Sequence, residues 1–255
     1  MLSSFSLVLV TGLAFQAGTP VSNSVIPPTT ASQLSPPLAP ISPEMRGDIM
    51  MARKMYRDAL DYYKPGADKS AVLANKTGIA YHQLLDLNNA RKYYEKAIKL
   101  NPKYSEAINN LGTIYYARKS YRRAVEQYKK ALRITPESAS ILSNLGTAYF
   151  ARKDYENASK AYQQALTIDP EVFERRSTQG TLLQDQSVEE RARFHYYLAK
   201  TYAQAGTKDR ALLYIRKALE EGFKDRDTFL KDPEFAALQD DPEFKELLTT
   251  EQRVL

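Results

Sequence analysis

The side chains that most often perform catalysis or hold metals are nearly absent from this sequence. It contains no Cys, which excludes thiolate catalysis, disulfide bonds and thiolate-bound zinc. His82 and His195 are the only histidines, so a histidine-based metal site or catalytic triad has few candidates. No nucleophile is paired with a base in a recognisable motif. The sequence therefore predicts a protein with no catalytic residues, no metal and no cofactor.

The composition favours helices as the elements that position the remaining functional groups. The chain has 255 residues, of which 43% are hydrophobic and 26% charged, as in an ordinary folded protein. Ten glycines leave little material for the frequent tight turns of an all-β protein.

The middle of the chain repeats itself with a fixed period of 34 residues. Gly78, Gly112 and Gly146 are spaced by this period. Five other sets share it: Tyr81, Tyr115, Tyr149; Ala90, Ala124, Ala158; Tyr94, Tyr128, Tyr162; Ala97, Ala131, Ala165; and Pro102, Pro136, Pro170. A fixed period of this length is typical of stacked helical units, none of which can bury its apolar face alone.

Each repeat is interpreted as two antiparallel helices. In one of them, the pattern predicts a first helix over residues 105–118 and a second over 121–134, with Pro136 preventing its continuation. Gly112 and Ala124 permit a close approach of the two helices, while Tyr115 and Tyr128 fill the wider gaps. Ala131 leaves room for the next repeat.

The spacing of Leu111, Gly112, Tyr115, Ala124, Tyr128, Ala131 and Pro136 resembles the tetratricopeptide repeat signature. The resemblance implies an all-α, right-handed superhelical solenoid with a concave groove lined by the first helix of each pair. It also implies a role in holding proteins or peptides. We interpret the chain as an exported bacterial member of this family.

Two degenerate repeats flank the regular ones. Gly47, Ala59 and Tyr63 reproduce the offsets of a first repeat, and Ala199, Ala211 and Ala218 those of a fifth, in which Ala replaces the glycine. The predicted segments are a signal peptide (1–18), a Pro/Ser-rich linker (19–43), five repeats (44–67, 71–104, 105–138, 139–172 and 192–222), an insertion (173–191) and a helical C-terminal cap (223–255).

The two ends of the chain differ from the repeats in composition. Residues 2–17 form an apolar run suited to a signal-peptide core, although no basic flank precedes it. Seven of the thirteen prolines lie between Thr19 and Pro43, which is typical of an extended, disordered linker. We expect an exported, periplasmic or secreted protein, or one tethered by an uncleaved leader. Near the other end, Asp232 and Asp241 each precede Pro, so two short helices are expected to cover the solenoid while their acidic residues face water.

The family resemblance also assigns residues to the groove. With Gly112 as position eight of its repeat, the peptide-binding residues are expected to be Asn75, Ile79, His82, Asn109, Asn110, Thr113, Tyr116, Asn144, Thr147 and Phe150. Asparagine presents a donor and an acceptor together, which suits the backbone of an extended peptide, and Tyr116 and Phe150 offer apolar anchors. Alternatively, the asparagine side chains form hydrogen bonds within their own helices. The Lys cluster of a carboxylate clamp is missing from these positions.

The charge of the chain is unevenly distributed. Residues 71–136 hold thirteen Lys/Arg against four Asp/Glu, whereas residues 220–255 hold five against eleven. The cations of the second helices, Arg91, Lys92, Lys96, Lys99, Arg122, Lys129, Lys130 and Arg133, are assigned to the convex face.

The predicted function is a non-catalytic scaffold for a protein or an extended peptide, in cell-envelope assembly or secretion. Two alternatives remain open. The basic convex face, most simply a solvated surface, would otherwise bind nucleic acid, although base-stacking aromatics are not evident there. The insertion 173–191, most simply a spacer, would otherwise serve an enzyme accessory subunit together with His195.

Overall fold

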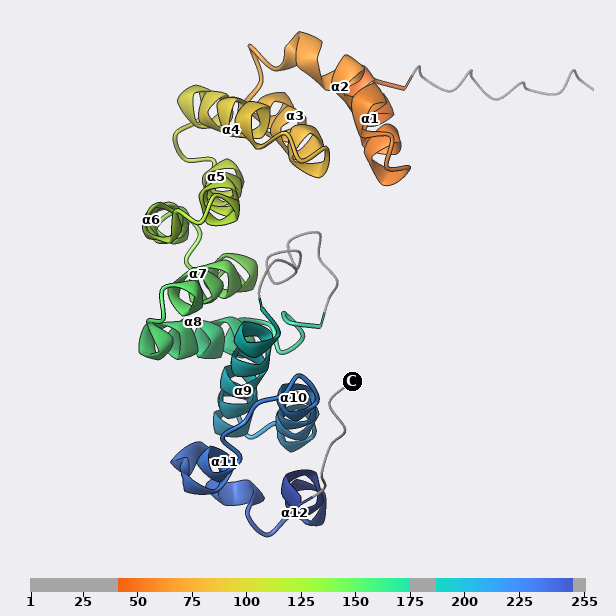
Figure 1. The fold of residues 1–255 in the computed structure, drawn as a ribbon. Coiled ribbons are helices and arrows are strands. Elements are labelled where there is room, and N and C mark those ends of the chain that lie inside the picture. Colours follow the sequence, from red (N-terminus) through yellow and green to blue (C-terminus); the bar gives the residue numbers. More distant parts are fainter. Residues whose placement is uncertain (1–40, 175–186, 250–255) are drawn as a thin grey trace, which may run out of the picture. The chain divides into compact units, whose positions relative to one another are not determined.

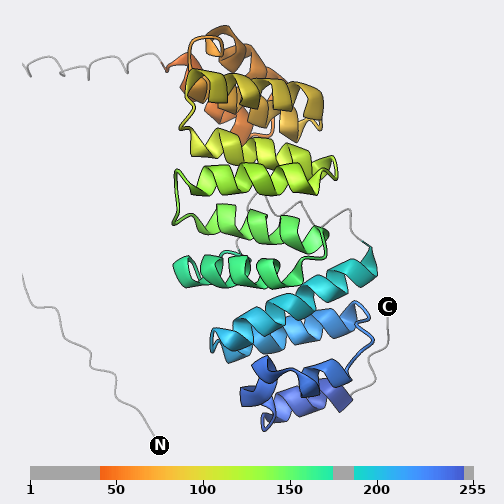
Figure 2. The same cartoon turned by 90° about the vertical axis from the view of Figure 1, so that its left-hand side faces the viewer.

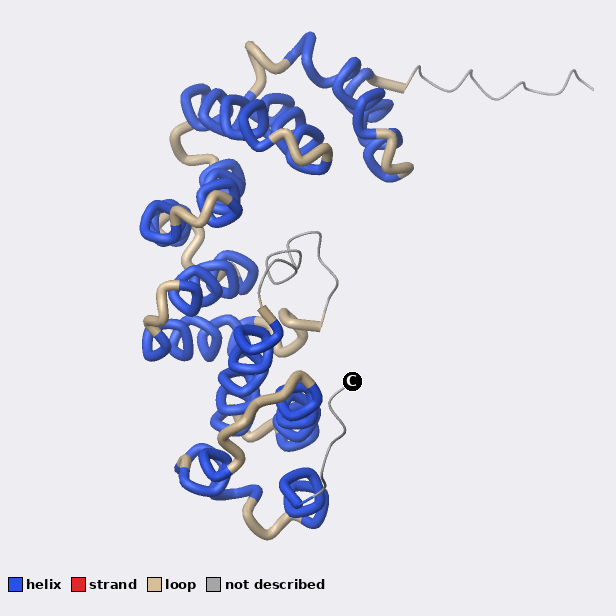
Figure 3. Tube along the Cα trace, viewed as in Figure 1, coloured by secondary structure: helices blue, strands red, loops and turns tan. Residues whose placement is uncertain are grey.

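Helices form all the regular structure in the residues that the computed structural model describes, 41–174 and 187–249 (Figure 3). These residues belong to one compact unit that begins at Ile41. The predicted signal peptide (1–18), most of the predicted linker (19–40), the centre of the insertion (175–186) and the last six residues (250–255) lie outside the described residues.

Within the described residues, ten helices form five antiparallel pairs that stack in chain order (Figures 1 and 2). We call the first helix of each pair helix A and the second helix B. The pairs are α1 (Pro43–Ala52) with α2 (Tyr56–Tyr63), α3 (Ala71–Gln83) with α4 (Leu87–Leu100), α5 (Ser105–Ala117) with α6 (Tyr121–Leu132), α7 (Ala139–Ala151) with α8 (Tyr155–Ile168), and α9 (Val188–Gln204) with α10 (Lys208–Glu220). The prediction of an all-α solenoid of helix pairs is confirmed.

Each helix A ends in the same tight turn. The residue that follows the C-cap has a positive φ, and it is Lys54, Leu85, Lys119, Lys153 or Gly206. The next backbone N–H then bonds back over five residues, as from Ser120 to the carbonyl of Tyr115 at 2.8 Å. Glycine is the residue that adopts this conformation without strain, so four of the five turns carry a less favourable residue. Helices α5 and α6 end one and two residues earlier than the sequence predicted.

A glycine of helix A meets a tyrosine ring of helix B inside each of the first four pairs. The contacts are Gly47–Tyr63, Gly78–Tyr94, Gly112–Tyr128 and Gly146–Tyr162. A Cβ atom at any of these glycines would lie 2.3–2.6 Å from the nearest ring carbon, which is closer than real Cβ contacts. All four rings are fully buried. The glycine therefore fixes how closely the two helices of a pair approach each other.

The fifth pair has other residues at the positions of the glycine and the tyrosine. Ala199 stands at the glycine position and Ile215 at the tyrosine position, and both are fully buried. The added methyl group on helix A is matched by a smaller side chain on helix B. Volume is conserved across the two positions, which explains why the repeat tolerates the loss of its glycine.

The C-terminal cap follows α10 and contains one element more than the sequence predicted. It consists of α11 (Asp227–Lys231), the 3₁₀ helix η3 (Pro233–Leu238) and α12 (Pro242–Thr249), and its core is formed by Phe229, Phe235 and Phe244. Asp241 caps α12 through the N–H of Phe244 at 3.0 Å. The expectation that the acidic residues face water is wrong for Asp232, Glu234 and Asp241, whose side chains are largely covered and pair with Lys200 of α9 or Lys208 of α10. Glu243 pairs with Arg216 but stays exposed.

In the part of the chain that the structure describes, none of the helices combines the length and the apolar character needed to cross a lipid bilayer.

The glycine–tyrosine contact predicts the effect of one methyl group. We expect Gly112→Ala to lower the free energy of unfolding by about 1–3 kcal/mol, because the new Cβ overlaps the ring of Tyr128. In the double variant with Tyr128→Ile, which copies the fifth pair, the two effects should be coupled by about 1 kcal/mol or more. Urea unfolding of the four proteins in the cycle measures this. If Gly112→Ala instead stabilises the protein by the helix propensity of alanine, the contact is not limiting.

The buried tyrosines predict a loss of stability at alkaline pH. Burial raises the pKa of the Tyr94, Tyr128 and Tyr162 hydroxyls, whereas an unfolded tyrosine ionises near pH ~10. Their contribution is therefore complete below the unfolded pKa and is lost as the pH rises through the higher folded pKa. Thermal melts between pH 8 and pH ~11 should show a falling melting temperature. Tyr128→Phe should make this fall shallower, and an unchanged slope would contradict the assignment.

Candidate functional site

The structure buries the four asparagines that the sequence assigned to a peptide-binding groove. They lie on the helices A, and the exposed fractions of Asn75, Asn109, Asn110 and Asn144 are 1%, 3%, 9% and 4%. Their side chains therefore do not form an open surface in this structure. Whether they contact a ligand stays a prediction, but their hydrogen-bonding groups already have other partners.

The four asparagine side chains form a ladder that joins three successive helices A. Asn110 on α5 donates to Asn75 Oδ1 on α3 at 3.0 Å, and Asn144 on α7 donates to Asn109 Oδ1 on α5 at 3.0 Å. A longer contact of 3.4 Å from Asn109 Nδ2 to Asn110 Oδ1 links the two halves. Buried amides need such partners, so the ladder satisfies them and fixes the register between neighbouring repeats.

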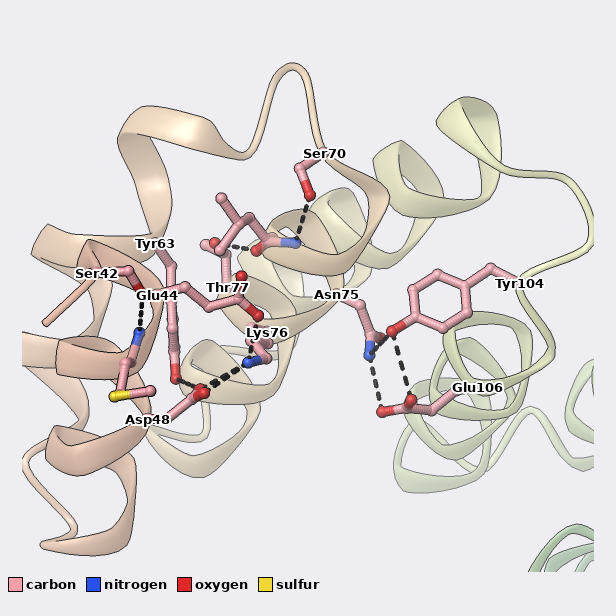
Figure 4. Close-up of polar contacts among 12 residues, drawn as sticks. Ser42, Glu44, Asp48, Tyr63, Ser70, Asn75, Lys76, Thr77, Tyr104 and Glu106 are labelled. Atoms are coloured by element: carbon pink, nitrogen blue, oxygen red, sulfur yellow. Dashed lines mark hydrogen bonds and ion pairs between the residues drawn. The ribbon is translucent and has the colours of Figure 1, made fainter. Parts of the chain in front are cut away.

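A polar group ends the ladder on α3 (Figure 4). Asn75 Nδ2 donates to Glu106 Oε1 at 2.9 Å, and it lies 3.4 Å from the hydroxyl of Tyr104. Both partners belong to the start of the next repeat. The amide of Asn75 is thus engaged on all sides, which removes it as a free donor or acceptor for a peptide.

Lys76 on α3 stands at the repeat position of Asn110 and Asn144, and it links the first two repeats by ion pairs (Figure 4). Lys76 Nζ lies 2.7 Å from Glu44 and 2.8 Å from Asp48, both on α1. Tyr63 also donates to Asp48 at 2.6 Å. Burial acts to raise the pKa of Asp48, but the ammonium of Lys76 and the Tyr63 hydroxyl hold it below its usual value. Lys76, Asn110 and Asn144 therefore share one task, because each reaches back to the preceding helix A.

The two predicted threonines lie within helix pairs. The Thr113 and Thr147 hydroxyls donate to backbone carbonyls one turn earlier, at 3.3 Å and 2.9 Å. Each also lies 3.4 Å from the hydroxyl of a buried tyrosine, Tyr128 or Tyr162. Both threonines are buried, so the structure assigns them to the interior of their repeats.

The predicted aromatic anchors, Tyr116 and Phe150, are also buried. Each packs against a tyrosine ring that is partly exposed. Tyr116 packs against Tyr121 with ring centroids 5.2 Å apart, and Phe150 packs against Tyr155 at 5.4 Å. Tyr116 and Phe150 are 6% and 4% exposed, whereas Tyr121 and Tyr155 are partly exposed. The anchors thus support the rings that a ligand would meet.

Ile79 and His82 on α3 remain partly exposed. They share α3 with Val72, which is 42% exposed, and with the partly exposed Gln83. Burial lowers the pKa of His82, so its imidazole is neutral at physiological pH. These are the residues of the predicted set that still present side chains on the surface.

The predicted groove residues all lie in the second to fourth repeats, and the prediction omits two residues of the fifth. With Ala199 as position eight, Arg193 and Tyr197 take positions two and six of α9. The Tyr197 ring stacks on Tyr155 of α8 at a centroid distance of 4.7 Å and an angle of 13°. Arg193 Nη1 donates to the Tyr155 hydroxyl at 3.1 Å. The alignment of Ala199 with the glycines of the other repeats is the sequence signal that identifies Arg193 and Tyr197.

His195 lies inside the fifth helix pair. Its Nδ1 is 3.0 Å from Glu221 Oε2, next to the C-terminal end of α10. Burial lowers the pKa of His195, and Glu221 acts against this shift. No group of three or more His, Asp or Glu side chains suited to a metal occurs in the described residues. Of the predicted insertion, residues 187–191 belong to α9 and its N-cap Ser187, and Phe173 packs against Tyr162 at 5.2 Å.

Comparisons with known proteins identify the repeats. Models described as the tetratricopeptide repeat match residues 71–104, 93–126, 139–172 and 180–225, and a model described as the TPR repeat matches residues 112–151. A comparison with curated protein sequences finds no match.

Solved structures with a similar fold include two of MamA. One, MamA 41-end from Desulfovibrio magneticus RS-1, is 22% identical, with 71% of this chain and 93% of that chain covered and a TM-score of 0.49. A second crystal structure of MamA is 22% identical, with coverages of 70% and 95% and a TM-score of 0.48. The first TPR of Spaghetti (RPAP3), bound to an HSP90 peptide, is 21% identical, with coverages of 45% and 86% and a TM-score of 0.40.

The asparagine ladder predicts a stability effect. We expect Asn110→Ala to lower the free energy of unfolding by about 1–3 kcal/mol, because it leaves the buried Asn75 Oδ1 without its donor. As a matched control, Asn157→Ala removes an exposed amide that bonds only to Asp154 on its own helix, and it should change stability by less than about 0.5 kcal/mol. Chemical unfolding compares the two. Equal effects would mean that the ladder does not couple the repeats.

Proposed function

The chain is a tetratricopeptide repeat protein, and on that premise we propose that it is a non-catalytic scaffold that binds a protein or an extended peptide along its helices A. The ligand lies across the exposed side chains of α3, α5, α7 and α9. We call this the A-helix surface. In the proposal, the asparagine ladder sets the spacing of these helices, and residues beside the ladder make the contacts.

The observation that carries the proposal is the partly exposed aromatic group at the junction of the fourth and fifth repeats. It consists of the stacked rings of Tyr155 and Tyr197, with Phe150 beneath them at 5.4 Å and 5.9 Å. Arg193 lies at its edge, held by the Tyr155 hydroxyl and by Glu189 at 3.3 Å. Tyrosine and arginine are the residue types that dominate binding energy at protein interfaces.

The supporting contacts make this group rigid. Phe194 also packs against Phe150 at 5.5 Å, so three helices hold the rings in place. A rigid aromatic surface loses little conformational entropy when a ligand binds. The arrangement fits an apolar or aromatic side chain of a peptide against the rings and a backbone carbonyl or carboxylate of that peptide against Arg193.

A second exposed strip lies on α3. Val72, Lys76, Ile79 and Gln83 recur at helical spacing, so they share one side of the helix. The strip combines apolar and polar side chains, as a peptide-binding surface does.

The cellular setting is part of the proposal. The apolar run at residues 2–17 supports export to the periplasm or beyond, or attachment by an uncleaved leader. A scaffold in that setting would act in cell-envelope assembly or secretion.

Selection of peptides from a random library on the full chain tests the proposal. We expect a selected peptide to bind Tyr197→Ala and Arg193→Gln at least about tenfold more weakly, because each removes part of the aromatic group or its edge. Arg57→Gln, an exposed arginine on α2, is the control and should leave the dissociation constant unchanged.

The proposal fails if no peptide is selected, or if the selected peptides bind both variants as tightly as the unaltered chain. Circular dichroism melts establish that the variants remain folded, so that a loss of binding reports on the surface.

A further inference from the structure

Helix α6 and the turns at its two ends carry a dense group of cations that form no ion pair among the described residues. Residues 118–133 hold seven cationic side chains and one acidic residue, Glu126. The cations are Arg118, Lys119, Arg122, Arg123, Lys129, Lys130 and Arg133, and all are exposed or partly exposed. Elsewhere, cations such as Lys76, Lys160, Lys200 and Arg216 lie against carboxylates. No ion pair involves residues 118–133 within the described chain.

Neutral groups position three of these cations. Arg118 donates to Asn88 Oδ1 at 2.6 Å, the Arg123 guanidinium lies 5.8 Å from the Tyr115 ring centroid, and Lys129 Nζ lies 5.5 Å from that of Tyr149. These contacts orient the side chains without neutralising them. Arg122, Lys129 and Arg133 follow helical spacing, so they form a stripe along one side of α6 that is about 16 Å long and includes the exposed Glu126. Lys119 lies in the turn before α6, where its φ is positive.

The repeat itself shows that the fold does not need this charge. Helix α8 occupies the same place in the next repeat and is shifted by 34 residues. Where α6 has Arg122, Arg123, Lys129, Lys130 and Arg133, α8 has Glu156, Asn157, Gln163, Gln164 and Thr167. Helix α4 has Asn88, Asn89 and Glu95 at the first three of these positions and Lys96 and Lys99 at the last two. The cations at the positions of Arg122, Arg123 and Lys129 are therefore particular to α6 among these three helices.

We propose that the outer face of α6, together with the turn that contains Lys119, is a docking surface for an anionic phospholipid bilayer. The stripe has long cationic side chains and no large exposed apolar residue between 118 and 133, which suits adsorption to lipid headgroups without insertion. The apolar run at residues 2–17, which we interpret as an export leader, is consistent with a chain that meets a membrane.

Nucleic acid is the other polyanion to consider, and the surface fits it less well. Each ring next to the stripe already has a neighbour against it, which is Arg123 for Tyr115, Lys129 for Tyr149 and Tyr116 for Tyr121, so the described residues show no row of free faces for base stacking. The peptide proposal uses helices α3, α5, α7 and α9 together with Tyr155 of α8 and no residue of α6, so the two proposals concern different residues (Figure 1).

Cosedimentation of the full chain with vesicles tests the proposal. The probes are vesicles of phosphatidylcholine with about one third phosphatidylglycerol and vesicles of phosphatidylcholine alone, at low and high salt, roughly 50 and 500 mM. We expect stronger binding to the anionic vesicles, weakened by salt. Binding to neutral vesicles measures the contribution of the leader.

The test variant replaces three cations with the residues that α8 carries at the same positions: Lys129→Gln, Lys130→Gln and Arg133→Thr. Its partition coefficient on anionic vesicles should fall on the order of a hundredfold. A second variant, Arg122→Asn with Arg123→Asn, copies α4, and its partition coefficient on anionic vesicles should fall at least about tenfold. The control removes the same charge from Lys64, Lys69 and Lys224, each replaced by Gln, and should bind within about threefold of the unaltered chain.

The proposal is overturned if the α6 variants bind anionic vesicles as the unaltered chain does, or if the control loses as much. It is also overturned if a duplex oligonucleotide binds more tightly than the anionic vesicles and loses affinity with the same substitutions, because the partner is then a nucleic acid.

Discussion

The absence of a side chain at four glycines is the constraint on which the rest of the structure depends. Each glycine lets helix A approach helix B until a tyrosine ring lies directly against its backbone, and the ring becomes fully buried. This close approach sets the distance between the two helices of a pair. It thereby also sets where the first helix of the next repeat packs. The fifth pair obeys the same constraint with alanine and isoleucine. The C-terminal cap then buries three phenylalanines, as expected for the last units of a repeat array.

The sequence predicted the helix pairs well because the constraint is local and repeated. Glycine, tyrosine, alanine and proline recur at fixed offsets, and each has one structural reason to do so. The asparagines were harder to interpret, because the pattern gives the face on which Asn110 lies but not the distance to Asn75 on the preceding repeat. Once the helices A approach closely, an amide satisfies its hydrogen bonds across the repeats more readily than toward solvent. Arg193 and Tyr197 are harder to predict for another reason, because the insertion interrupts the 34-residue spacing between the fourth and fifth repeats.

The two helices of a pair have different surfaces. Helices A carry polar groups that link repeat to repeat, and at the junction of α7, α8 and α9 they share a partly exposed aromatic group with Tyr155 of α8. Helix α6 carries cations that the repeat does not require. This division suits a scaffold that holds a polypeptide on one side while another side contacts an anionic surface. Neither surface includes the glycines and tyrosines in contact inside the pairs. Residues of either surface can therefore be substituted without loss of those contacts.

The central claim is that a polypeptide ligand lies on helices A. Hydrogen–deuterium exchange of the full chain, with and without a bound peptide, tests it most directly, because amides next to a ligand exchange more slowly. The account predicts added protection within α7 (Ala139–Ala151) and α9 (Val188–Gln204), with α4 (Leu87–Leu100) and α6 (Tyr121–Leu132) unchanged. Protection confined to α4 and α6 would contradict it.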